Sequence, residues 1–382
     1  MEDKFYMQRV LELAQQGKGK TSPNPLVGTV IVKNNRIISE GYHRSYGDKH
    51  AEVVAMENAG EDLSGATLYC NLEPCSHNTP EKKTPPCTQR IIQENIRRVV
   101  IAGEDPNPLV NGSGIRQLRE NGIIVDVLPP AEDSRRLNEK YFKFIKTGKP
   151  FIHLKIAQSL DGRIATASGS SQWVTNQSAI RLVHEWRAEY DAVLVGANTV
   201  MQDNPSLNVR LVEGRHPYRV VLDNRLLIPD QAHLISDELR HRTIIFTTQN
   251  AGHPRVSELM KKEIQVISLP PDSRGLVPLE EAMQRLAELK IASVLVEGGG
   301  EVFTSFIRQR LFDKISVFIA PKIIGSGIES IGDLGIQTLQ DAYNLEAVSI
   351  KIIDNQALME GYQDYHALFE NQGTAGNVYR HY

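Results

Sequence analysis

Apolar residues in roughly the first 130 positions of this chain switch repeatedly between helical and strand spacing. Residues 2–16 place them three and four apart, which predicts an amphipathic helix. Residues 26–32 and 37–41 are two apolar runs joined by a short polar segment, a pattern typical of a β-hairpin. Later runs predict strands at 67–70, 98–102 and 123–128, and helices from residue 49, at 86–95 and at 113–121. This alternation predicts an α/β domain.

Pro129 and Pro130 interrupt the alternation, and the segment after them divides the chain. Residues 132–146 carry charges of both signs and predict one helix, which ends at the Gly-Lys-Pro sequence 148–150. Such punctuation is typical of a domain boundary. We therefore predict two domains, residues 1–147 and residues 148–382.

The first domain contains a set of residues with the chemistry of zinc ligands. His50 stands two residues before Glu52, and Cys75 and Cys87 each follow a proline. One histidine and two cysteines leave the fourth position of a tetrahedral Zn²⁺ for water, as in catalytic sites. Zinc lowers the pKa of that water to about 7, so we predict attack by hydroxide with Glu52 moving the proton. This is the division of labour in zinc nucleobase deaminases.

The plainer interpretation is that the His-x-Glu sequence is incidental and the cysteines are small buried residues. The chain has only three cysteines, and two of them lie in this segment, which favours the metal site. Cys70 ends an apolar run and is expected to be a buried thiol. The predicted helices place His50 and Glu52 in one first turn and Cys87 near the start of another helix, so the helices would meet the metal end-on.

Four runs of the first domain together resemble the deaminase half of the bifunctional riboflavin-biosynthesis deaminase/reductase family. They are TSPNPLVG at 21–28, HAE at 50–52, LEPCSH at 72–77 and KTPPC at 83–87. The loop between the last two runs, residues 78–82, is about three residues longer than is usual in the family and lacks its glycine. The resemblance implies that Asn24, His77, Lys83 and Thr84 hold the pyrimidine and its ribose.

Runs in the second domain resemble the reductase half of the same family, so the resemblance covers nearly the whole chain. They are the opening LKIAQSLDGR at 154–163, SQWVT at 171–175, RAEYDAVLVGANTV at 187–200, DNPSLNVR at 203–210 and VEGGG at 296–300. The implied fold class is α/β throughout, a cytidine-deaminase-like α/β/α domain followed by a dihydrofolate-reductase-like α/β domain. No GxGxxG sequence follows a predicted strand, in agreement with that second fold.

The reductase resemblance also implies a substrate side and an NADPH side. A glycine turn between a predicted strand and a helix can cradle a phosphate, and the motif context favours this function for residues 298–300. The substrate side comprises Ser171, Arg187, Leu207, Arg210 and Glu297, with the two arginines suited to the 5′-phosphate. The cofactor side comprises Ala157, Trp173, Thr199, Asp203, Asn224, Gly298, Gly299 and Gly300.

Two further positions in the second domain leave alternatives open. Lys155 is either a proton donor or phosphate contact, or a lysine at a strand edge. Leu227 stands where the family commonly has an arginine, three residues after Asn224, so the residue that selects NADPH over NADH is not evident.

Composition narrows the classes of partner. A net charge of −3 gives no general basic surface, which argues against binding of duplex nucleic acid. The N-terminal segment lacks the uninterrupted apolar stretch of a signal peptide, and no stretch approaches the ~20 apolar residues of a membrane span. We expect a cytoplasmic homo-oligomer that binds Zn²⁺, NADPH and a pyrimidine ribosyl phosphate, without nucleic acid or membrane.

Two competing hypotheses remain at this stage. One is a tRNA-type or cytidine-type deaminase fused to an unrelated oxidoreductase, although the basic and aromatic surface that tRNA requires is not evident. The other is a zinc-stabilised scaffold without catalysis, in which Glu52 is incidental; removing the metal would then unfold the first domain.

Overall fold

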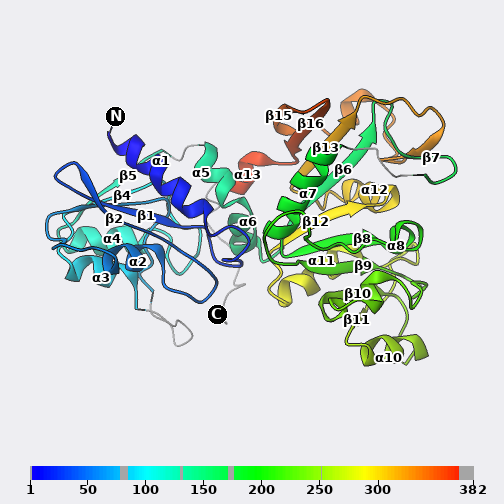
Figure 1. Cartoon of the computed structure of the whole chain (residues 1–382), viewed down its shortest axis with the longest axis horizontal. Coiled ribbons are helices and arrows are strands. Elements are labelled where there is room, and N and C mark those ends of the chain that lie inside the picture. The colour runs from blue at the N-terminus through cyan, green and yellow to red at the C-terminus, as the bar shows by residue number, and fades with distance from the viewer. Residues whose placement is uncertain (1, 78–84, 130–131, 171–175, 251, 370–382) are drawn as a thin grey trace. The chain divides into compact units, whose positions relative to one another are not determined.

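A computed structural model describes residues 2–77, 85–129, 132–170, 176–250 and 252–369. It divides into two compact units (Figure 1), one formed by residues 2–148 with 368–369 and the other by residues 149–367. No helix in the described ranges is long and apolar enough to cross a membrane.

The first unit is built on a five-stranded sheet with the order β2-β1-β3-β4-β5. The hairpin and the β1–β3 pair are antiparallel, whereas β3, β4 and β5 run parallel. The elements are α1 Glu2–Gln15, β1 Gly28–Lys33, β2 Arg36–Tyr42, α2 Ala51–Glu57, β3 Thr67–Cys70, α3 Cys87–Gln93, β4 Arg98–Ile101, α4 Ser113–Glu120, β5 Ile124–Val127, α5 Glu132–Leu137 and α6 Glu139–Thr147. The predicted α/β alternation of this half is confirmed.

Helices cover both faces of this sheet because its strands alternate their apolar side chains between the two faces. On one face, Val10 of α1 packs with Val30 and Val100. On the other, Ile31 and Leu68 belong to the core that also contains residues of α2, α3 and α4. The result is a three-layer α/β/α unit.

The expected single helix at residues 132–146 is wrong, because the structure breaks it into α5 and α6 at Asn138. The Asn138 side chain accepts a hydrogen bond from the Leu26 amide at 2.7 Å and donates one to the Leu26 carbonyl at 2.9 Å. Asn138 is buried, and its side chain is engaged by a backbone segment distant in sequence. Such side-chain to backbone hydrogen bonds compete with regular helix, which explains the break. The same two hydrogen bonds hold Leu26 in place, and with it the segment that carries Asn24.

The second unit is built on a nine-stranded sheet with the order β11-β10-β9-β8-β12-β6-β13-β16-β15. The strands from β11 to β13 run parallel, and β16 and β15 complete the sheet in antiparallel fashion. A separate pair joins β7 to β14. The strands are β6 Phe151–Ser159, β7 Arg163–Thr166, β8 Ala192–Gly196, β9 Tyr218–Leu222, β10 Thr243–Thr247, β11 Gln265–Ser268, β12 Ser293–Gly298, β13 Lys314–Ala320, β14 Gly327–Glu329, β15 Glu346–Ile353 and β16 Gln356–Tyr362.

Buried apolar strands form the core of this unit, with helices packed against them. Leu154 and Val296 lie in one core with Phe303 and Phe306 of α12, and Phe318 lies in another with residues of α7. Parallel strands covered on both faces are expected to be apolar almost throughout, as β8 and β12 are. The helices are α7 Gln177–Glu189, α8 Ala197–Asp203, α9 His233–Ser236, α10 Pro254–Lys261, α11 Leu279–Glu288, α12 Gly300–Arg308 and α13 Tyr365–Phe369, with short 3₁₀ helices at Arg240–Arg242 and Leu339–Asp341.

The Asn138 contacts generate a prediction about local stability. Asn138→Ala should leave the Leu26 amide without its acceptor, at a cost of about 1–3 kcal/mol for a buried group. Hydrogen exchange at Leu26, followed by mass spectrometry, should accelerate accordingly. Asn121→Ala is the control, because the Asn121 side chain is exposed and bonds only within its own helix turn. Unchanged protection of Leu26 would contradict this account.

Candidate active sites

The three predicted zinc ligands of the first unit come together in space. His50 is the residue before α2, Cys75 lies in the loop after β3, and Cys87 is the first residue of α3. The Nδ1 atom of His50 lies 3.4 Å from the Cys75 sulfur and 3.3 Å from the Cys87 sulfur. The three ligand atoms all lie within 4.8 Å of one another. A single ion between them would contact all three.

This donor set fits zinc. Two sulfurs and one imidazole nitrogen are the ligand types that Zn²⁺ prefers, and three protein ligands leave one position open. The backbone amide of Cys87 donates to the Cys75 sulfur at 3.3 Å, which favours the thiolate over the thiol. His50 lies just outside its helix, in extended conformation, instead of within the first turn as the sequence predicted. The helices still meet the site by their N-terminal ends.

Glu52 lies in the first turn of α2 and is 3% exposed. Burial raises the pKa of this carboxyl above its usual range. A raised pKa makes it easier for a carboxyl to take up a proton, which acid–base catalysis requires. Glu52 also lines the cavity at the metal site, so it can face a bound molecule.

A cavity of about 290 Å³ adjoins the predicted zinc ligands, entirely within the first unit. Asn24 and His77, both predicted to contact substrate, line it. The other two predicted contacts, Lys83 and Thr84, lie outside the described residues. Sequence reasoning missed His43, Asp105 and several further lining residues, which include Asn107, Leu109 and Tyr141.

His43 is held in one neutral form beside the predicted zinc ligands. Its Nδ1 lies 3.1 Å from the Lys49 carbonyl and its Nε2 lies 3.2 Å from the Asn24 side-chain nitrogen. A carbonyl can only accept, so Nδ1 carries the hydrogen and Nε2 accepts from Asn24. Burial lowers the pKa of His43, in agreement with a neutral ring. The hydrogen bond to His43 engages the Asn24 side-chain nitrogen, which leaves the side-chain oxygen available to the cavity.

Asp105 is a second buried acid of this cavity. Its carboxylate accepts hydrogen bonds from the Tyr141 hydroxyl at 2.8 Å and the Asn107 amide at 2.9 Å. Burial raises the pKa of Asp105 to about 7, so it exchanges a proton near neutrality. The sequence signal for it was weak, because Asp105 stands in an ordinary polar turn after β4.

Glu73 organises the loop that carries Asp105. Its buried carboxylate accepts hydrogen bonds from four backbone amides: those of Asp105 at 3.2 Å, Gly112 at 2.9 Å, Gly114 at 2.8 Å and Ile115 at 3.1 Å. The last two belong to the first turn of α4, where a negative charge also complements the helix dipole. A Cβ on Gly114 would lie 2.2 Å from the Pro74 carbonyl, so only glycine allows this approach.

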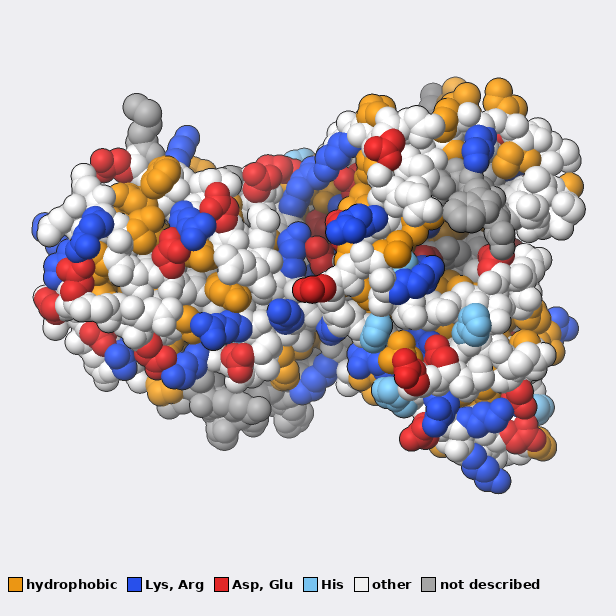
Figure 2. All heavy atoms as spheres, in the orientation of Figure 1, with side chains coloured by type: hydrophobic (Ala, Val, Ile, Leu, Met, Phe, Trp, Pro, Cys, Tyr) orange, Lys and Arg blue, Asp and Glu red, His pale blue; other side chains and the backbone are white. Residues whose placement is uncertain are grey.

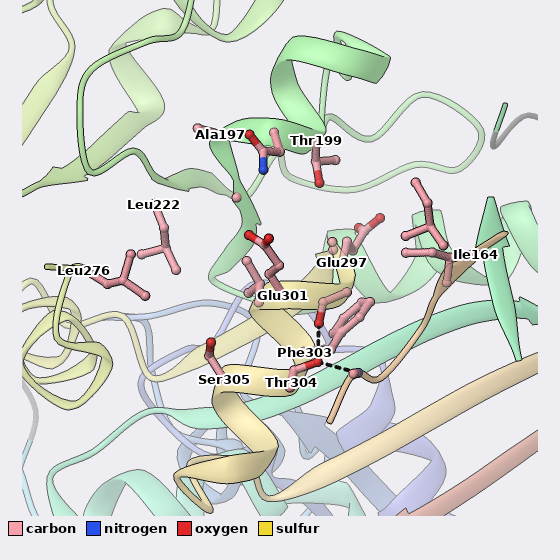
Figure 3. A pocket seen from close by; sticks show the side chains of 18 of the residues that line it. Ile164, Ala197, Thr199, Leu222, Leu276, Glu297, Glu301, Phe303, Thr304 and Ser305 are labelled. Carbon is pink, nitrogen blue, oxygen red and sulfur yellow. Dashed lines mark hydrogen bonds between the residues drawn. The ribbon is translucent and has the colours of Figure 1, made fainter. Parts of the chain in front are cut away.

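A larger cavity, of about 1200 Å³, lies at the carboxyl ends of the parallel strands in the second unit. Figure 3 shows Leu222 and Leu276 on one side, Ile164 on the other, and Glu297 and Thr199 between them. The cavity collects most of the predicted cofactor residues: Ala157, Thr199, Asp203, Asn224, Gly298, Gly299 and Gly300. Trp173 and the substrate-side Ser171 lie outside the described residues.

The glycine turn of this cavity fits a dinucleotide phosphate. Gly299 precedes α12, and a Cβ there would lie 3.2 Å from the Thr199 hydroxyl. A Cβ on Gly300 would lie 2.5 Å from the Glu329 carbonyl. Glycine at these two positions therefore permits the close approach of Glu329 and Thr199 to the turn. The turn leads into a nine-residue helix, whose first amide groups favour an anion. The Thr304 hydroxyl supports the turn, donating to the Gly300 carbonyl and accepting from the Gly332 amide (Figure 3).

Arg187 and Glu297, both predicted on the substrate side, form a bidentate ion pair. The Nε and Nη2 atoms of Arg187 donate to the two Glu297 oxygens at 2.6 and 2.8 Å. The remaining Nη1 atom donates to the Asn208 carbonyl at 3.2 Å. Arg187 lowers the pKa of Glu297 against the opposing effect of burial. Burial lowers the pKa of Lys155, which lines the same cavity as Glu297.

The segment 203–210 supplies the other predicted substrate residues. Arg210 is exposed, whereas the Leu207 side chain is buried and its backbone adopts a φ of 48°. His184, which sequence reasoning missed, accepts a hydrogen bond from the Arg210 amide at 3.3 Å. Burial, followed by the charges of Arg187 and Arg210, lowers the pKa of His184 to about 4. The ring is therefore neutral at physiological pH and can accept this bond.

Two family models match the chain, one in each predicted domain. The model described as the cytidine and deoxycytidylate deaminase zinc-binding region matches residues 1–103. The model described as the RibD C-terminal domain matches residues 150–359. The chain is 44% identical over 350 residues to riboflavin biosynthesis protein RibD of Aquifex aeolicus, covering 91% of this chain and 95% of the relative. It is 38% identical over 358 residues to the Escherichia coli RibD, covering 90% and 94%.

Solved structures agree with these sequence matches. A diaminohydroxyphosphoribosylaminopyrimidine deaminase/5-amino-6-(5-phosphoribosylamino)uracil reductase of Thermotoga maritima superposes with a TM-score of 0.83 at 38% identity, covering 94% of this chain and 98% of its own. Form 1 of Acinetobacter baumannii RibD gives a TM-score of 0.84 at 32% identity, with the same coverage. Both predicted fold classes, cytidine-deaminase-like and reductase, are confirmed.

The Glu73 contacts generate a prediction for the first cavity. Glu73→Gln keeps the side-chain size but turns an NH₂ group toward backbone amides, which leaves buried donors without an acceptor at about 1–3 kcal/mol each. Glutamine keeps one accepting oxygen, so hydrogen exchange should accelerate either at Gly114 and Ile115 or at Asp105 and Gly112, according to the position that the NH₂ group takes. Glu104→Gln is the control, since Glu104 is exposed in the same loop. Equal exchange in the two variants would show that Glu73 does not hold this loop.

Proposed function

Because this chain belongs to the RibD family of bifunctional riboflavin biosynthesis enzymes, we propose which of its residues carry out the two reactions. The chain is a zinc-dependent deaminase and an NADPH-dependent reductase of the riboflavin pathway. The first reaction removes the 2-amino group of 2,5-diamino-6-(5-phosphoribosylamino)pyrimidin-4(3H)-one, and the second reduces the ribosyl side chain to the ribitylamino product. We assign deamination to residues 1–147 and reduction to residues 148–382.

His50, Cys75 and Cys87 hold the zinc in this proposal, and the convergence of their three ligand atoms is the observation that carries it. Bound zinc supplies an activated water at neutral pH. Glu52 takes a proton from that water and delivers it to the 2-amino group, which then leaves as ammonia. Without this transfer, the amine is the poorer leaving group and the addition reverses. The burial of Glu52 beside the ligands supports this role.

The pyrimidine occupies the cavity at these ligands. Asn24, held by His43, and His77 hold the pyrimidine and its ribose, together with Lys83 and Thr84. The buried pair of Asp105 and Tyr141 lies on the wall of the same cavity, where it can accept or share a proton with a ring amine. This neutral and acidic environment suits a polar heterocycle better than a phosphate, which needs cations.

In the second cavity, NADPH supplies hydride to C1′ of the opened ribosyl group. Ala157, Trp173, Thr199, Asp203, Asn224 and the glycine turn 298–300 hold the cofactor in this proposal. Ser171, Leu207, Arg210, Arg187 and Glu297 hold the substrate. Arg210 is the freer guanidinium for the 5′-phosphate, since Arg187 already engages Glu297 on two of its nitrogens. Lys155, with its lowered pKa, is placed to donate the proton that accompanies the hydride.

We also propose that the chain forms a homo-oligomer through the exposed face of β15. This strand is the edge of the nine-stranded sheet. Val348, Ile350 and Ile352 point to one side of it and are 46%, 65% and 72% exposed. An apolar row on an exposed edge strand is a surface that a second copy can cover.

A cytoplasmic location is part of the proposal, because none of the three cysteines is in a disulfide and two of them are the proposed zinc ligands. We propose no nucleic-acid partner. On the face drawn in Figure 2, lysines and arginines are interspersed with acidic side chains and form no continuous basic surface in either unit.

The proton-shuttle assignment predicts a separation of metal binding from activity. Glu52→Gln should keep about one zinc per chain, because Glu52 is not a ligand, while ammonia release falls by at least about a hundredfold. Reduction of the already deaminated pyrimidine should be unchanged. Zinc is measured by metal analysis, and ammonia and NADPH oxidation are followed separately.

Glu57→Gln is the matched control, on the same helix but exposed. Near-normal ammonia release by Glu52→Gln would refute the shuttle. If Cys75→Ser retained full zinc, the ligand set itself would be wrong.

The oligomer assignment predicts that Ile350→Lys shifts the sedimentation mass toward a single 42.7 kDa chain. A lysine in a shared apolar row would have to be buried without a partner, which is strongly unfavourable. Leu339→Lys is the control, since Leu339 is 94% exposed outside this row. If Ile350→Lys leaves the oligomer as intact as Leu339→Lys does, the interface lies elsewhere.

A further inference from the structure

Two arginines that none of the sequence motifs singled out line the second cavity. Arg225 directly follows Asn224, at the end of β9, and Arg274 lies in the turn before α11. Both side chains are exposed, and within the described part of the chain neither forms an ion pair or a side-chain hydrogen bond. Both guanidinium groups are therefore available to an anion bound in this cavity.

The structure holds the two segments against each other. The Asn224 side-chain oxygen accepts a hydrogen bond from the Val277 amide at 2.8 Å, which ties the turn to the end of β9. Within the turn, the Asp272 carboxylate accepts from the Arg274 and Leu276 amides, each at 2.9 Å. The Oδ1 atom of Asp272, the acid nearest in sequence to Arg274, is therefore engaged by backbone amides. The two arginines extend from positions that the fold fixes.

The order of the sheet indicates which part of NADPH reaches this wall. Strands β6, β12, β8 and β9 are parallel neighbours, so the segments at their carboxyl ends share one edge. Lys155 and Glu297 lie on β6 and β12, and the glycine turn follows β12. The end of β9 lies two strands beyond β12. A dinucleotide with its reactive end at Glu297 and its pyrophosphate at the turn therefore extends its adenosine toward β9.

The side chains near β9 suit an adenosine. Leu222 and Leu276 lie on one side of the cavity in Figure 3, and Leu227 lines it as well. They provide an apolar surface for the flat adenine ring. The adenosine 2′-phosphate, the group that distinguishes NADPH from NADH, would stand beside this surface. Leu227 cannot bind it.

We propose that Arg225 and Arg274 bind the 2′-phosphate of NADPH and so determine the cofactor preference of this chain. The inference depends on the assignment of this cavity to the cofactor, made under the proposed function. Guanidinium groups recognise phosphate oxygens through planar, charged hydrogen bonds. Arg308, the third arginine on the cavity wall, is a weaker candidate. It stands at the far end of α12 from the glycine turn and donates to the Asp333 carbonyl.

The test is direct binding of NADPH and NADH to the full chain without the pyrimidine, followed by nucleotide fluorescence. Arg225→Ala and Arg274→Ala should each weaken NADPH binding about ten- to a hundredfold, with NADH binding changed less than twofold. The fragment 2′,5′-ADP should lose affinity as NADPH does, and 5′-AMP should not. Leu227→Arg, added to either variant, should restore part of the lost NADPH affinity. Arg308→Ala is the matched control.

The outcomes separate this inference from the cofactor-cavity assignment. Thr199→Trp places a large ring in the cavity beside the glycine turn and should weaken the binding of both nucleotides; if it weakens neither, the cavity assignment fails. If Thr199→Trp weakens the binding of both nucleotides but the arginine variants leave the ratio of NADPH to NADH affinity unchanged, only the 2′-phosphate inference fails. Equal losses for both nucleotides in the arginine variants, or a selective loss in Arg308→Ala, would also overturn it.

Discussion

Parallel pairing of neighbouring strands is the constraint on which both active sites depend. In the first unit, β3 and β4 run parallel, so the loops that carry Cys75 and Asp105 leave the sheet at the same edge. In the second, the parallel strands β6, β12, β8 and β9 bring Lys155, Glu297 and Asn224 to one cavity wall. Neither arrangement needs sequence proximity, because the ladder of backbone hydrogen bonds sets the position of each loop.

The first unit contains buried carboxyl groups of two kinds: one supports the structure, and the others are suited to proton transfer. Glu73 has its acceptor capacity filled by four backbone amides, so it acts as a fixed support for the neighbouring loop. Burial raises the pKa of Glu52 and of Asp105, and both face the cavity. A satisfied charge rigidifies its surroundings, whereas a buried acid with a raised pKa is available for proton exchange. The two kinds are directly linked, because the Glu73 carboxylate accepts a hydrogen bond from the Asp105 amide.

The second unit uses charge differently. The Arg187–Glu297 pair is nearly inaccessible, and its bidentate geometry fixes a carboxylate beside Lys155. Breaking such a buried pair costs several kcal/mol, so the pair also restrains α7 against the end of β12. By contrast, Arg210, Arg225 and Arg274 remain exposed to solvent or to the cavity. Exposed arginines are available to phosphates, whereas two nitrogens of the buried Arg187 are already engaged by Glu297.

The sequence by itself determined the α/β alternation, and it predicted the three proposed zinc ligands and the glycine turn, because each depends on local spacing or on distinctive chemistry. His50, Cys75 and Cys87 have few alternative functions in that pattern, and strand periodicity identified β3 within its true bounds. Only the tertiary structure decided the break at Asn138, whose partner is the Leu26 backbone, 112 residues away in sequence. The same holds for His43, Asp105, Arg225 and Arg274. These are common residue types in ordinary turns. They line the two cavities only because the fold brings the ends of distant strands together.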